Sequence, residues 1–522
     1  MKDNELYTTA DIKDIRGILE LRAKVTPEMP IIKYKKGKEL VTVTCGMLWA
    51  DVCRFGTYLT RRYPERSRFA LLGENSYLWI ITFFAIVVAD GIVVPFDKDF
   101  ATADLRALLE RCPVEALICS DSYKDVAEEL RESGAVNELI EMGSIPEIME
   151  SEATVSPERE TDPGAVCAIL FTSGTTGDPK GVMMSQTNYV WDILKGIRSI
   201  WLTGPNVLTL PLHHSFAFTI NVLGAYICGS CAYLSRGLRY FQKELKEYSP
   251  ENLGVVPLYV ETIYKNIWKT AAERGSEKAL RRLVSLSRFL RRIGIDLRRK
   301  LFRPVLAELG GNLTNILCGG AFLDQKYIDG MADFGISILN GYGITECSPI
   351  VSFNRFGEER AHSVGQPIEG CEVKIEDGEI CVRGENVMLG YYEEEAATAE
   401  VIRNGWFYTG DLGYLDDDGY LYITGRKKNL IILSNGENVS PEELELKLME
   451  IGNVDEVIVS EENGAITAEI YAEDRRGIDE AVDRLNRLLP IYKRIQNIKY
   501  RETAFEKTTT RKIKRSYHDR ER

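Results

Sequence analysis

A polar, glycine-containing run at residues 172–181 is the part of the chain best suited to chemistry on an anion. It reads Thr-Ser-Gly-Thr-Thr-Gly-Asp-Pro-Lys-Gly and directly follows the apolar segment 168–171. Glycines let a chain fold tightly around an anion, hydroxyls and backbone N–H groups donate hydrogen bonds, and Lys180 adds a positive charge. The run therefore predicts a polyphosphate-binding loop at the end of a buried strand.

The phosphate loop of nucleoside triphosphatases is excluded by the residues around the lysine. That loop requires G-x-x-x-x-G-K-[ST]. Here Pro179 stands where its second glycine would be, and Gly181 replaces the hydroxyl residue that would hold magnesium. The alternative for the run taken alone is a surface loop rich in Gly, Ser and Thr.

Four further stretches carry residues that suit a nucleotide. They combine flexible glycines with an aromatic ring, a hydroxyl, a carboxylate or a guanidinium group, and each alone is weak because turn glycines and surface charges are common. They are Cys318-Gly319-Gly320-Ala321, Asn340-Gly341-Tyr342-Gly343-Ile344-Thr345-Glu346, Tyr408-Thr409-Gly410-Asp411 and Ile423-Thr424-Gly425-Arg426. Together they offer a place for a flat base, for ribose hydroxyls and for phosphate.

The elements that must position these residues follow from the apolar pattern. Strand-like apolar runs alternate with helical stretches over the first 350 residues, which favours α/β layers. The runs are 69–72, 92–94, 116–119, 168–171 and 316–318. From about Glu372, short alternating strands with tight turns predict a small β-rich region, followed by a polar break at 427–429 and a strand at 430–433. Ser440 and Pro441 then predict the start of a helix.

We therefore expect an α/β protein of two domains. Residues 1–427 would form a large N-terminal domain of layered α/β subdomains plus the small β-rich subdomain. Residues 428–522 would form a mobile C-terminal α+β domain.

Composition narrows the class of protein. The chain is 44% hydrophobic and 27% charged, which is typical of soluble globular proteins. Its net charge of −13 argues against a nucleic-acid binder. Its eleven cysteines, scattered in apolar surroundings, and an N-terminus without an apolar signal core predict a cytoplasmic protein. The apolar stretch 77–96 is long enough to span a membrane, but Gly91 and Pro95 favour a buried helix followed by a strand.

The stretches together resemble the adenylate-forming superfamily of acyl-CoA synthetases, peptide-synthetase adenylation domains and firefly luciferase. The similarity runs from Asn75 to Arg515. Residues 172–181 match the family phosphate loop T-S-G-T-T-G-x-P-K-G, residues 341–346 match its G-Y-G-x-T-E, and residues 408–411 match its segment ending in T-G-D.

The resemblance implies a role for each matching residue. The phosphates of ATP would be held by Thr172, Ser173, Gly174, Thr175, Thr176, Gly177 and Lys180. Adenine and ribose would be bordered by Gly320, Ala321, Asn340, Gly341, Tyr342, Gly343, Asp411 and Arg426. The catalytic residues would be Thr345, Glu346, which would bind Mg²⁺, and Lys512, with a hinge at Lys428 and a thiol channel at Gly436.

Four positions depart from the family pattern, and one of them is Asn435, which stands where many relatives have a second glycine. The segment around Lys512 resembles P-K-T-x-x-G-K-[IV]-x-R, but Glu506 replaces the proline and Arg511 the glycine. At the hinge, Lys428 stands where aspartate is commoner. A basic tail without a catalytic function is the alternative reading of the C-terminus.

The segment 210–218 resembles the family stretch that closes the acyl pocket. His214 and Phe216 would line that pocket, together with Pro257. Amino-acid-activating relatives place an aspartate in this stretch, and none is present here. The segment 278–304 looks most like long-chain fatty acyl-CoA synthetases.

We therefore expect a ligase that uses ATP and Mg²⁺ to convert a medium- or long-chain fatty acid to acyl-AMP, and then passes the acyl group to coenzyme A. Transfer to an acyl carrier protein and activation of an aromatic or other non-amino acid are alternatives. A third is a relative that binds the nucleotide without catalysis. Acyl chain length and oligomeric state cannot be predicted from the sequence.

The segment Arg281–Arg303 is unusual in an acidic chain. It holds nine Lys or Arg and a single Asp, interleaved with apolar residues at helical spacing. Two partners fit such a segment: a membrane surface, which would make the protein peripheral to the membrane, and the acidic helix of an acyl carrier protein. An amphipathic helix with a solvated basic face is the alternative.

Overall fold

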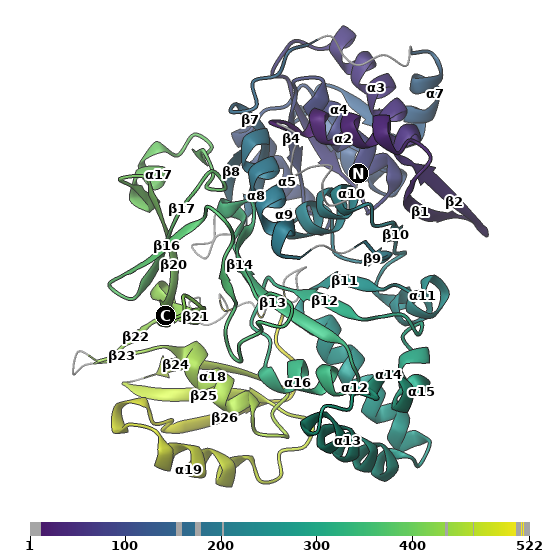
Figure 1. Ribbon diagram of the computed structural model, residues 1–522. Helices are drawn as coiled ribbons and strands as arrows, with labels where there is room; N and C mark the ends of the chain where they lie inside the picture. The colour runs from purple at the N-terminus through teal and green to yellow at the C-terminus, as the bar shows by residue number, and fades with distance from the viewer. Residues whose placement is uncertain are drawn as a thin grey trace. The chain divides into compact units, whose positions relative to one another are not determined.

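A computed structural model describes residues 12–152, 159–172, 179–200, 203–433, 437–462, 464–507, 513 and 515 (Figure 1). Its contacts divide the chain into two compact units. The first consists of Met1–Glu359, Ile368–Cys371 and Arg383–Glu400, and the second of Arg360–Pro367, Glu372–Val382 and Val401–Arg522. The domain boundary expected at Lys428 stays a prediction.

The first unit contains two large sheets that are parallel except at their edges. In the first sheet the order is β14-β13-β12-β11-β9-β10-β1-β2, and only the outer strands β14 and β2 run antiparallel to their neighbours. Its strands are β1 (Pro30–Lys36), β2 (Glu39–Thr44), β9 (Asn206–Leu208), β10 (Ala232–Leu234), β11 (Asn252–Val255), β12 (Asn315–Cys318), β13 (Ser337–Gly343) and β14 (Ile350–Phe353).

The second sheet has the order β18-β8-β7-β4-β3-β5-β6. Strands β7, β4, β3, β5 and β6 are parallel, and β8 and β18 add an antiparallel edge. Its strands are β3 (Arg68–Leu72), β4 (Ile92–Pro95), β5 (Ala116–Cys119), β6 (Leu139–Glu141), β7 (Val166–Thr172), β8 (Lys180–Ser185) and β18 (Gly390–Tyr391). The five predicted strand runs therefore all form strands.

Helices of the first unit cover these sheets (Figure 1). They are α2 (Ile15–Val25), α3 (Cys45–Arg62), α4 (Tyr77–Val88), α5 (Thr102–Arg111), α6 (Lys124–Glu132), α7 (Ile145–Glu150), α8 (Gln186–Ser199), α9 (Ser215–Phe218), α10 (Ala225–Cys228), α11 (Phe241–Tyr248), α12 (Pro257–Glu273), α13 (Glu277–Arg292), α14 (Arg298–Leu301), α15 (Arg303–Ala307), α16 (Gln325–Asp333) and α17 (Glu395–Val401). A π-helical turn, η3 (Thr219–Gly224), joins α9 to α10.

The apolar stretch 77–96 forms the predicted helix followed by a strand. The Ser76 hydroxyl caps α4, and nearly every residue of this helix is buried. The helix ends before Gly91, where an added Cβ would lie 2.9 Å from the Ile86 side chain, and β4 follows. No helix in the described part of the chain is both long enough and apolar enough to span a membrane.

The second unit has one β-rich and one α+β part. Its strands are β15 (Gln366–Pro367), β16 (Glu372–Glu376), β17 (Glu379–Arg383), β19 (Ile402–Arg403), β20 (Trp406–Leu415), β21 (Leu421–Arg426), β22 (Ile431–Ile432), β23 (Asn438–Val439), β24 (Glu456–Glu462), β25 (Ala465–Tyr471) and β26 (Asn497–Arg501). Its helices α18 (Pro441–Met449) and α19 (Ile478–Leu488) share a core with the β24-β25-β26 sheet.

Two predictions for this unit have different outcomes. The helix predicted after Ser440 is confirmed, because α18 begins at Pro441 and the Ser440 hydroxyl accepts a hydrogen bond from the Glu443 N–H. The strand predicted at 430–433 is shorter than expected, because only Ile431 and Ile432 pair with β23.

Candidate active site

Two neighbouring parallel strands, β12 and β13, end side by side and carry the residues predicted to border adenine. Cys318 pairs with Asn340, so Gly320 and Ala321 follow the end of β12 next to the segment that holds Gly341 and Tyr342. Gly320 has a φ of +83° and is exposed, as is Ala321. The carboxyl ends of parallel strands are where open α/β sheets bind ligands.

The glycines of β13 are required by the packing of β14. A Cβ at Gly341 would lie 2.3 Å from the ring of Phe353, and one at Gly343 would lie 2.0 Å from the Pro349 carbonyl oxygen. A Cβ at Gly319 would lie 3.3 Å from the ring of Phe216. The lack of a side chain therefore lets aromatic rings pack against the backbone at Gly319 and Gly341, and a carbonyl group at Gly343.

Asn340 carries an unsatisfied polar atom at this strand end. Its side chain is buried, and its Oδ1 has no hydrogen-bond partner among the described residues. Its backbone carbonyl accepts hydrogen bonds from the N–H and the side-chain amide of Asn354. Since buried polar atoms are rarely left unpaired, Oδ1 is a candidate acceptor for a ligand N–H group.

A second cluster joins Lys180 to Glu346 through an aromatic ring. The Lys180 ammonium lies 4.7 Å from the centre of the Tyr391 ring, and the Tyr391 hydroxyl donates a 3.0 Å hydrogen bond to Glu346 Oε1. Burial, together with the charge of Glu346, raises the pKa of Tyr391, so its hydroxyl stays protonated and keeps donating. β18 holds Tyr391 in place by pairing with Val182 of β8.

The predicted phosphate loop begins and ends on two paired strands. Thr172, the last residue of β7, pairs with Lys180, the first residue of β8. Ser173, Gly174, Thr175, Thr176 and Gly177 lie outside the described residues. The structure therefore places the two ends of the loop, with Lys180 against the ring of Tyr391.

Thr345 and Glu346 form a short 3₁₀ turn, η5 (Thr345–Cys347), after β13. The Ser215 hydroxyl, at the start of α9, donates a 3.4 Å hydrogen bond to the Thr345 hydroxyl. This bond connects Thr345, a predicted catalytic residue, to the segment 210–218, which is predicted to close the acyl pocket.

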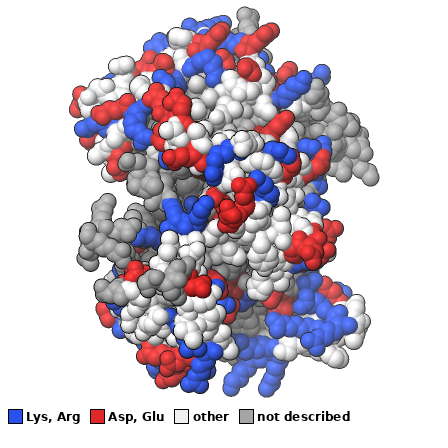
Figure 2. All heavy atoms as spheres, turned by 90° about the vertical axis from the view of Figure 1, so that its left-hand side faces the viewer, with Lys and Arg blue, Asp and Glu red and all other residues white. Residues whose placement is uncertain are grey.

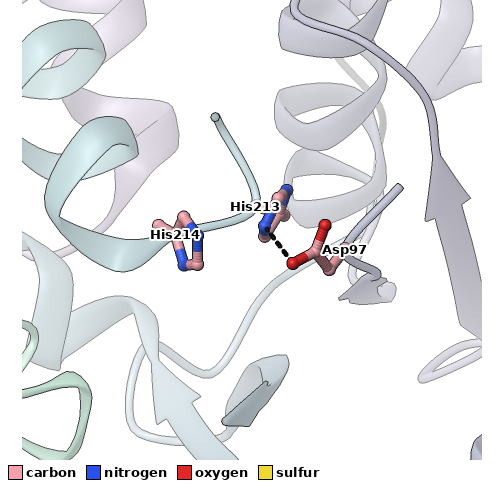
Figure 3. Close-up of side chains that lie close together, drawn as sticks. All are labelled: Asp97, His213 and His214. Atoms are coloured by element: carbon pink, nitrogen blue, oxygen red, sulfur yellow. Dashed lines mark ion pairs between the residues drawn. The ribbon is translucent and has the colours of Figure 1, made fainter. Parts of the chain in front are cut away.

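His214 lies in a polar cluster with His213 and Asp97 (Figure 3). The rings of His213 and His214 are 4.2 Å apart, and His213 Nε2 lies 3.5 Å from Asp97 Oδ2. The three side chains offer atoms within 4.8 Å of one another, as metal ligands do. Asn75 fixes the preceding turn, because its amide donates to the Leu210 carbonyl and accepts from the Leu212 N–H.

An apolar cavity lies behind the strands that carry these residues. It is enclosed by α8, η3, α10 and the strands β9, β11, β12 and β14. Its lining residues are Ile193, Gly196, Ile197, Ile200, Asn206, Ile220, Asn221, Gly224, Ala225, Cys228, Ser230, Asn252, Leu253, Gly254, Leu317, Ile350 and Phe353. Phe353 thus contacts both the cavity and Gly341. Phe216 packs against a neighbouring core, and Pro257 begins α12 as a buried residue.

The second unit holds the predicted ribose ligand in an ion pair. Asp411 of β20 is buried and pairs in register with Arg426 of β21, whose Nε lies 2.6 Å from Asp411 Oδ1. The neighbouring Glu379 accepts from the Gly410 N–H and from the Lys427 ammonium, at 2.9 and 2.7 Å. One carboxylate oxygen of Asp411 is thus engaged by a guanidinium.

The predicted hinge residue, Lys428, and the predicted catalytic lysine, Lys512, lie near the two ends of the C-terminal segment 428–522. Lys428 is exposed in a 3₁₀ turn, η6 (Lys427–Asn429), directly after β21. Gly436 and Lys512 lie outside the described residues. Beside Lys512, Ile513 forms a bridge to Lys507, and Arg515 forms ion pairs with Glu442 and Glu445.

Comparison with known proteins identifies the family. The AMP-binding enzyme family model matches residues 19–392, and the chain belongs to this family. It is an adenylate-forming enzyme of the acyl- and aryl-CoA ligase superfamily, and the resemblance seen in the sequence is confirmed.

Among curated proteins, the chain is 32% identical to the long-chain-fatty-acid–CoA ligase FadD15 of Mycobacterium bovis over 416 residues, which is 73% of this chain and 68% of the relative. Among solved structures, the anthranilate CoA ligase AuaEII in complex with anthranoyl-AMP superposes with a TM-score of 0.82 at 20% identity, over 100% of this chain and 99% of that one.

The o-succinylbenzoate CoA synthetase MenE of Bacillus subtilis, solved with ATP and magnesium ion, has a TM-score of 0.77 at 23% identity, over 96% and 98% of the two chains. These two likenesses confirm the predicted fold class, a layered α/β architecture with a smaller C-terminal part.

Sequence reasoning did not find Tyr391, Asn75 or Asp97. Tyr391 is separated from Glu346 by 45 positions and from Lys180 by 211, and no motif marks it. The only sequence signal for Tyr391 is that two tyrosines, Tyr391 and Tyr392, follow Gly390 directly after an apolar segment.

Proposed function

We propose that this enzyme activates a medium- or long-chain fatty acid as acyl-AMP, with release of pyrophosphate, and then forms a thioester with coenzyme A. The observation that carries the choice of acid is the apolar cavity behind β12 and β14, which shares Phe353 with the strand end predicted to hold adenine. An apolar cavity suits a hydrocarbon chain and stabilises it by about 0.8 kcal/mol for each buried CH₂ group.

The first step joins two anions and needs charge neutralisation. A carboxylate oxygen of the acid attacks the α-phosphorus of ATP, the bond from that phosphorus to the bridging oxygen of pyrophosphate breaks, and a mixed anhydride with AMP forms. We assign Lys180 and residues 172–177 to the departing phosphates, and Thr345 and Lys512 to the α-phosphate. Fixed positive charge and donors at this point lower the barrier by electrostatic stabilisation.

The base and the ribose are assigned to residues at the strand ends. Asn340 Oδ1, buried and without a described partner, suits the exocyclic amino group of adenine. Gly320, Ala321, Gly341, Tyr342 and Gly343 would border the ring. Asp411, a buried carboxylate held by Arg426, would accept the ribose hydroxyls.

Magnesium fits the carboxylate of Glu346. Mg²⁺ prefers oxygen ligands and is usually held by one or two carboxylates together with the phosphates of a nucleotide. The hydrogen bond from Tyr391 orients the Glu346 carboxylate. When bound, the ion would neutralise phosphate charge.

Coenzyme A is favoured as the thiol because the curated relatives are named CoA ligases, and Gly436 and Lys428 are assigned to the thiol channel and the hinge of a rotating C-terminal part. Transfer to an acyl carrier protein and activation of an aromatic acid are the alternatives. His214, Phe216 and Pro257 are not among the residues that line the apolar cavity, so their assignment to the acyl pocket stays a prediction.

Product analysis tests this proposal. The protein is incubated with ATP, Mg²⁺ and one acid at a time, and acyl-AMP is quantified by mass spectrometry before and after addition of coenzyme A or a holo acyl carrier protein. We expect acyl-AMP from fatty acids and its conversion to acyl-CoA with equimolar AMP. If acyl-AMP is consumed only when the carrier protein is added, the acceptor is the carrier protein and not coenzyme A. If acyl-AMP forms only from aromatic acids, the substrate is an aromatic acid and not a fatty acid.

A further inference from the structure

Helix α13 (Glu277–Arg292) is apolar on two opposite faces. One face packs against the first unit through the buried residues Leu280, Val284 and Ser287. A surface helix normally has a single apolar face that points to the core and a polar face that points to water. A second apolar face therefore needs its own explanation.

The inward face is firmly held. Asp333 of α16 is buried, and it accepts hydrogen bonds from both Arg288 and Arg291 of α13 at 2.5–3.2 Å. Arg281 stacks over the ring of Trp268, 4.6 Å from its centre, and forms a 2.7 Å ion pair with Glu277. These contacts fix the rotation of α13 about its own axis.

The outward face carries an apolar stripe, which consists of Leu286, Phe289 and Ile293 and continues to Ile295. The first three are spaced by three and four positions, so they lie on one side of the helix. The exposed fractions of these four side chains lie between 43% and 60%. Single exposed apolar residues are common, but contiguous ones mark an interaction surface.

Basic side chains lie on the helix of the apolar stripe and in the segment that follows it. Arg282, Arg292, Lys300 and Arg303 are exposed, and none of them has an ion pair with a described residue. Arg299 is also exposed, but its guanidinium donates to the carbonyls of Gly311 and Leu313. The segment 281–303 carries nine Lys or Arg against one Asp, in a chain with a net charge of −13. Figure 2 shows acidic and basic side chains interspersed over most of one face, with Lys and Arg gathered toward its lower right.

We propose that the outward face of α13 docks on an anionic lipid bilayer, with the apolar stripe inserted at the headgroup level and the surrounding arginines and lysines on lipid phosphates. Apolar side chains bordered by basic ones are the pattern of helices that lie in a membrane interface. The inference rests on the proposed function, because a bilayer is where a long-chain fatty acid partitions.

The apolar stripe favours a bilayer over an acidic protein helix. Electrostatic complementarity to an acidic partner accounts for the arginines but gives no reason for Phe289 and Ile293 to be exposed. A bilayer satisfies both features of the surface, since phosphates pair with the guanidinium groups and the acyl boundary takes the rings and branched chains.

Vesicle co-sedimentation tests the proposal without any enzymatic readout. The full chain is mixed with vesicles of phosphatidylcholine alone or of phosphatidylcholine and phosphatidylglycerol in a three-to-one ratio. We expect binding to the anionic vesicles that weakens with salt. The double variant Leu286→Ser/Phe289→Ser and the charge variant Arg282→Glu/Arg292→Glu should each lower the bound fraction about fivefold or more.

Matched controls distinguish binding through this surface from nonspecific adsorption to vesicles. Leu488 and Ile491 are exposed by 84% and 78% but lie in the second unit, so Leu488→Ser/Ile491→Ser should bind vesicles like the wild type. Thermal melting checks that all variants are folded. Unchanged binding in both α13 variants would overturn the proposal, and so would absence of vesicle binding together with charge-dependent binding to a holo carrier protein.

The failure of the docking proposal and the failure of the proposed function can be told apart. Vesicle binding without acyl-AMP formation would refute the proposed function and leave the docking surface standing. Acyl-AMP formation without vesicle binding would refute the docking surface and leave the proposed function standing.

Discussion

At the scale of single residues, Tyr391 connects the parts of the candidate site. Its ring lies beside the Lys180 ammonium, and its hydroxyl donates to the Glu346 carboxylate. It is a positioning residue in our proposal, because it contacts the assigned phosphate and Mg²⁺ ligands rather than the substrate. Sequence patterns identified both partners but not the tyrosine between them.

We expect Tyr391→Phe to lower the rate of adenylation about tenfold and to raise the Mg²⁺ concentration needed for half-maximal rate. A hydrogen bond to a charged group is worth about 1.5–3 kcal/mol, and the phenylalanine keeps the ring beside Lys180. The measurement is the ATP–pyrophosphate exchange rate across a Mg²⁺ titration. Tyr392→Phe is the control, since its hydroxyl contacts Arg68 instead; an equal effect in both variants would contradict a specific role for Tyr391.

The burial of Asp192 makes the free energy of unfolding depend on pH. This residue of α8 is fully buried, its Oδ2 accepts a 3.2 Å hydrogen bond from the Ile350 N–H, and the Asn386 side chain also favours the charged form of its carboxyl group. Burial raises its pKa well above the usual value of 3.8. The folded state then binds the proton more tightly than the unfolded state, so stability falls as pH rises from about 3.8 to the folded-state pKa, and stays lower above it.

Asp192→Asn removes this titration and keeps an acceptor for Ile350. We expect the variant to melt about 2 °C or more above the wild type at pH 8, with the difference shrinking toward pH 4. Differential scanning calorimetry across this range is the measurement. A variant that melts lower than the wild type at pH 8 would show that the charged carboxylate stabilises the fold.

At the scale of elements, periodicity and caps predicted the strands and helices that carry the site. The stretch 77–96 forms α4 and β4 because a serine cap begins the helix and the crowded Gly91 ends it. The strand predicted at 430–433 is only two residues long. Apolar residues alone could not give its length, because that depends on how much of β23 is available to pair.

Because β13 packs closely on β14, any side chain at Gly341 should destabilise the fold. Because a Cβ would lie 2.3 Å from the Phe353 ring, we expect Gly341→Ala to lower the free energy of unfolding by about 1–3 kcal/mol. Denaturant unfolding gives the value. Gly452→Ala is the control, since no atom lies within 4 Å of its added Cβ, and it should stay within about 0.5 kcal/mol.

The cavity between α8, α10 and the first sheet should set the length of the acyl chain. Ala225 of α10 lines this cavity, so Ala225→Leu should lower kcat/KM for hexadecanoic acid about tenfold relative to octanoic acid. The control is Ala23→Leu, at a buried alanine of α2 outside the cavity, which should change both acids equally. An unchanged ratio in Ala225→Leu would place the acyl chain elsewhere.

At the scale of the whole molecule, the sequence predicted the fold class, which is confirmed, and its motifs named candidate site residues, but it did not predict the contacts between them. Motifs such as residues 172–181 and 341–346 are local, so they can be recognised in one sequence. The cavity, the unpaired Asn340 oxygen and the Tyr391 bridge arise from segments tens to hundreds of positions apart. Such contacts have no signature in a single sequence without a known fold.

The central claim is that the chain transfers AMP to a fatty acid. The most direct measurement is ATP–pyrophosphate exchange in the wild type with a panel of fatty, aromatic and amino acids. We predict exchange that requires an added acid, is fastest with a medium- or long-chain fatty acid, is absent with amino acids, and is lost in Lys512→Ala. Exchange with none of the acids would contradict the account, and the chain would then be a nucleotide-binding relative without this activity.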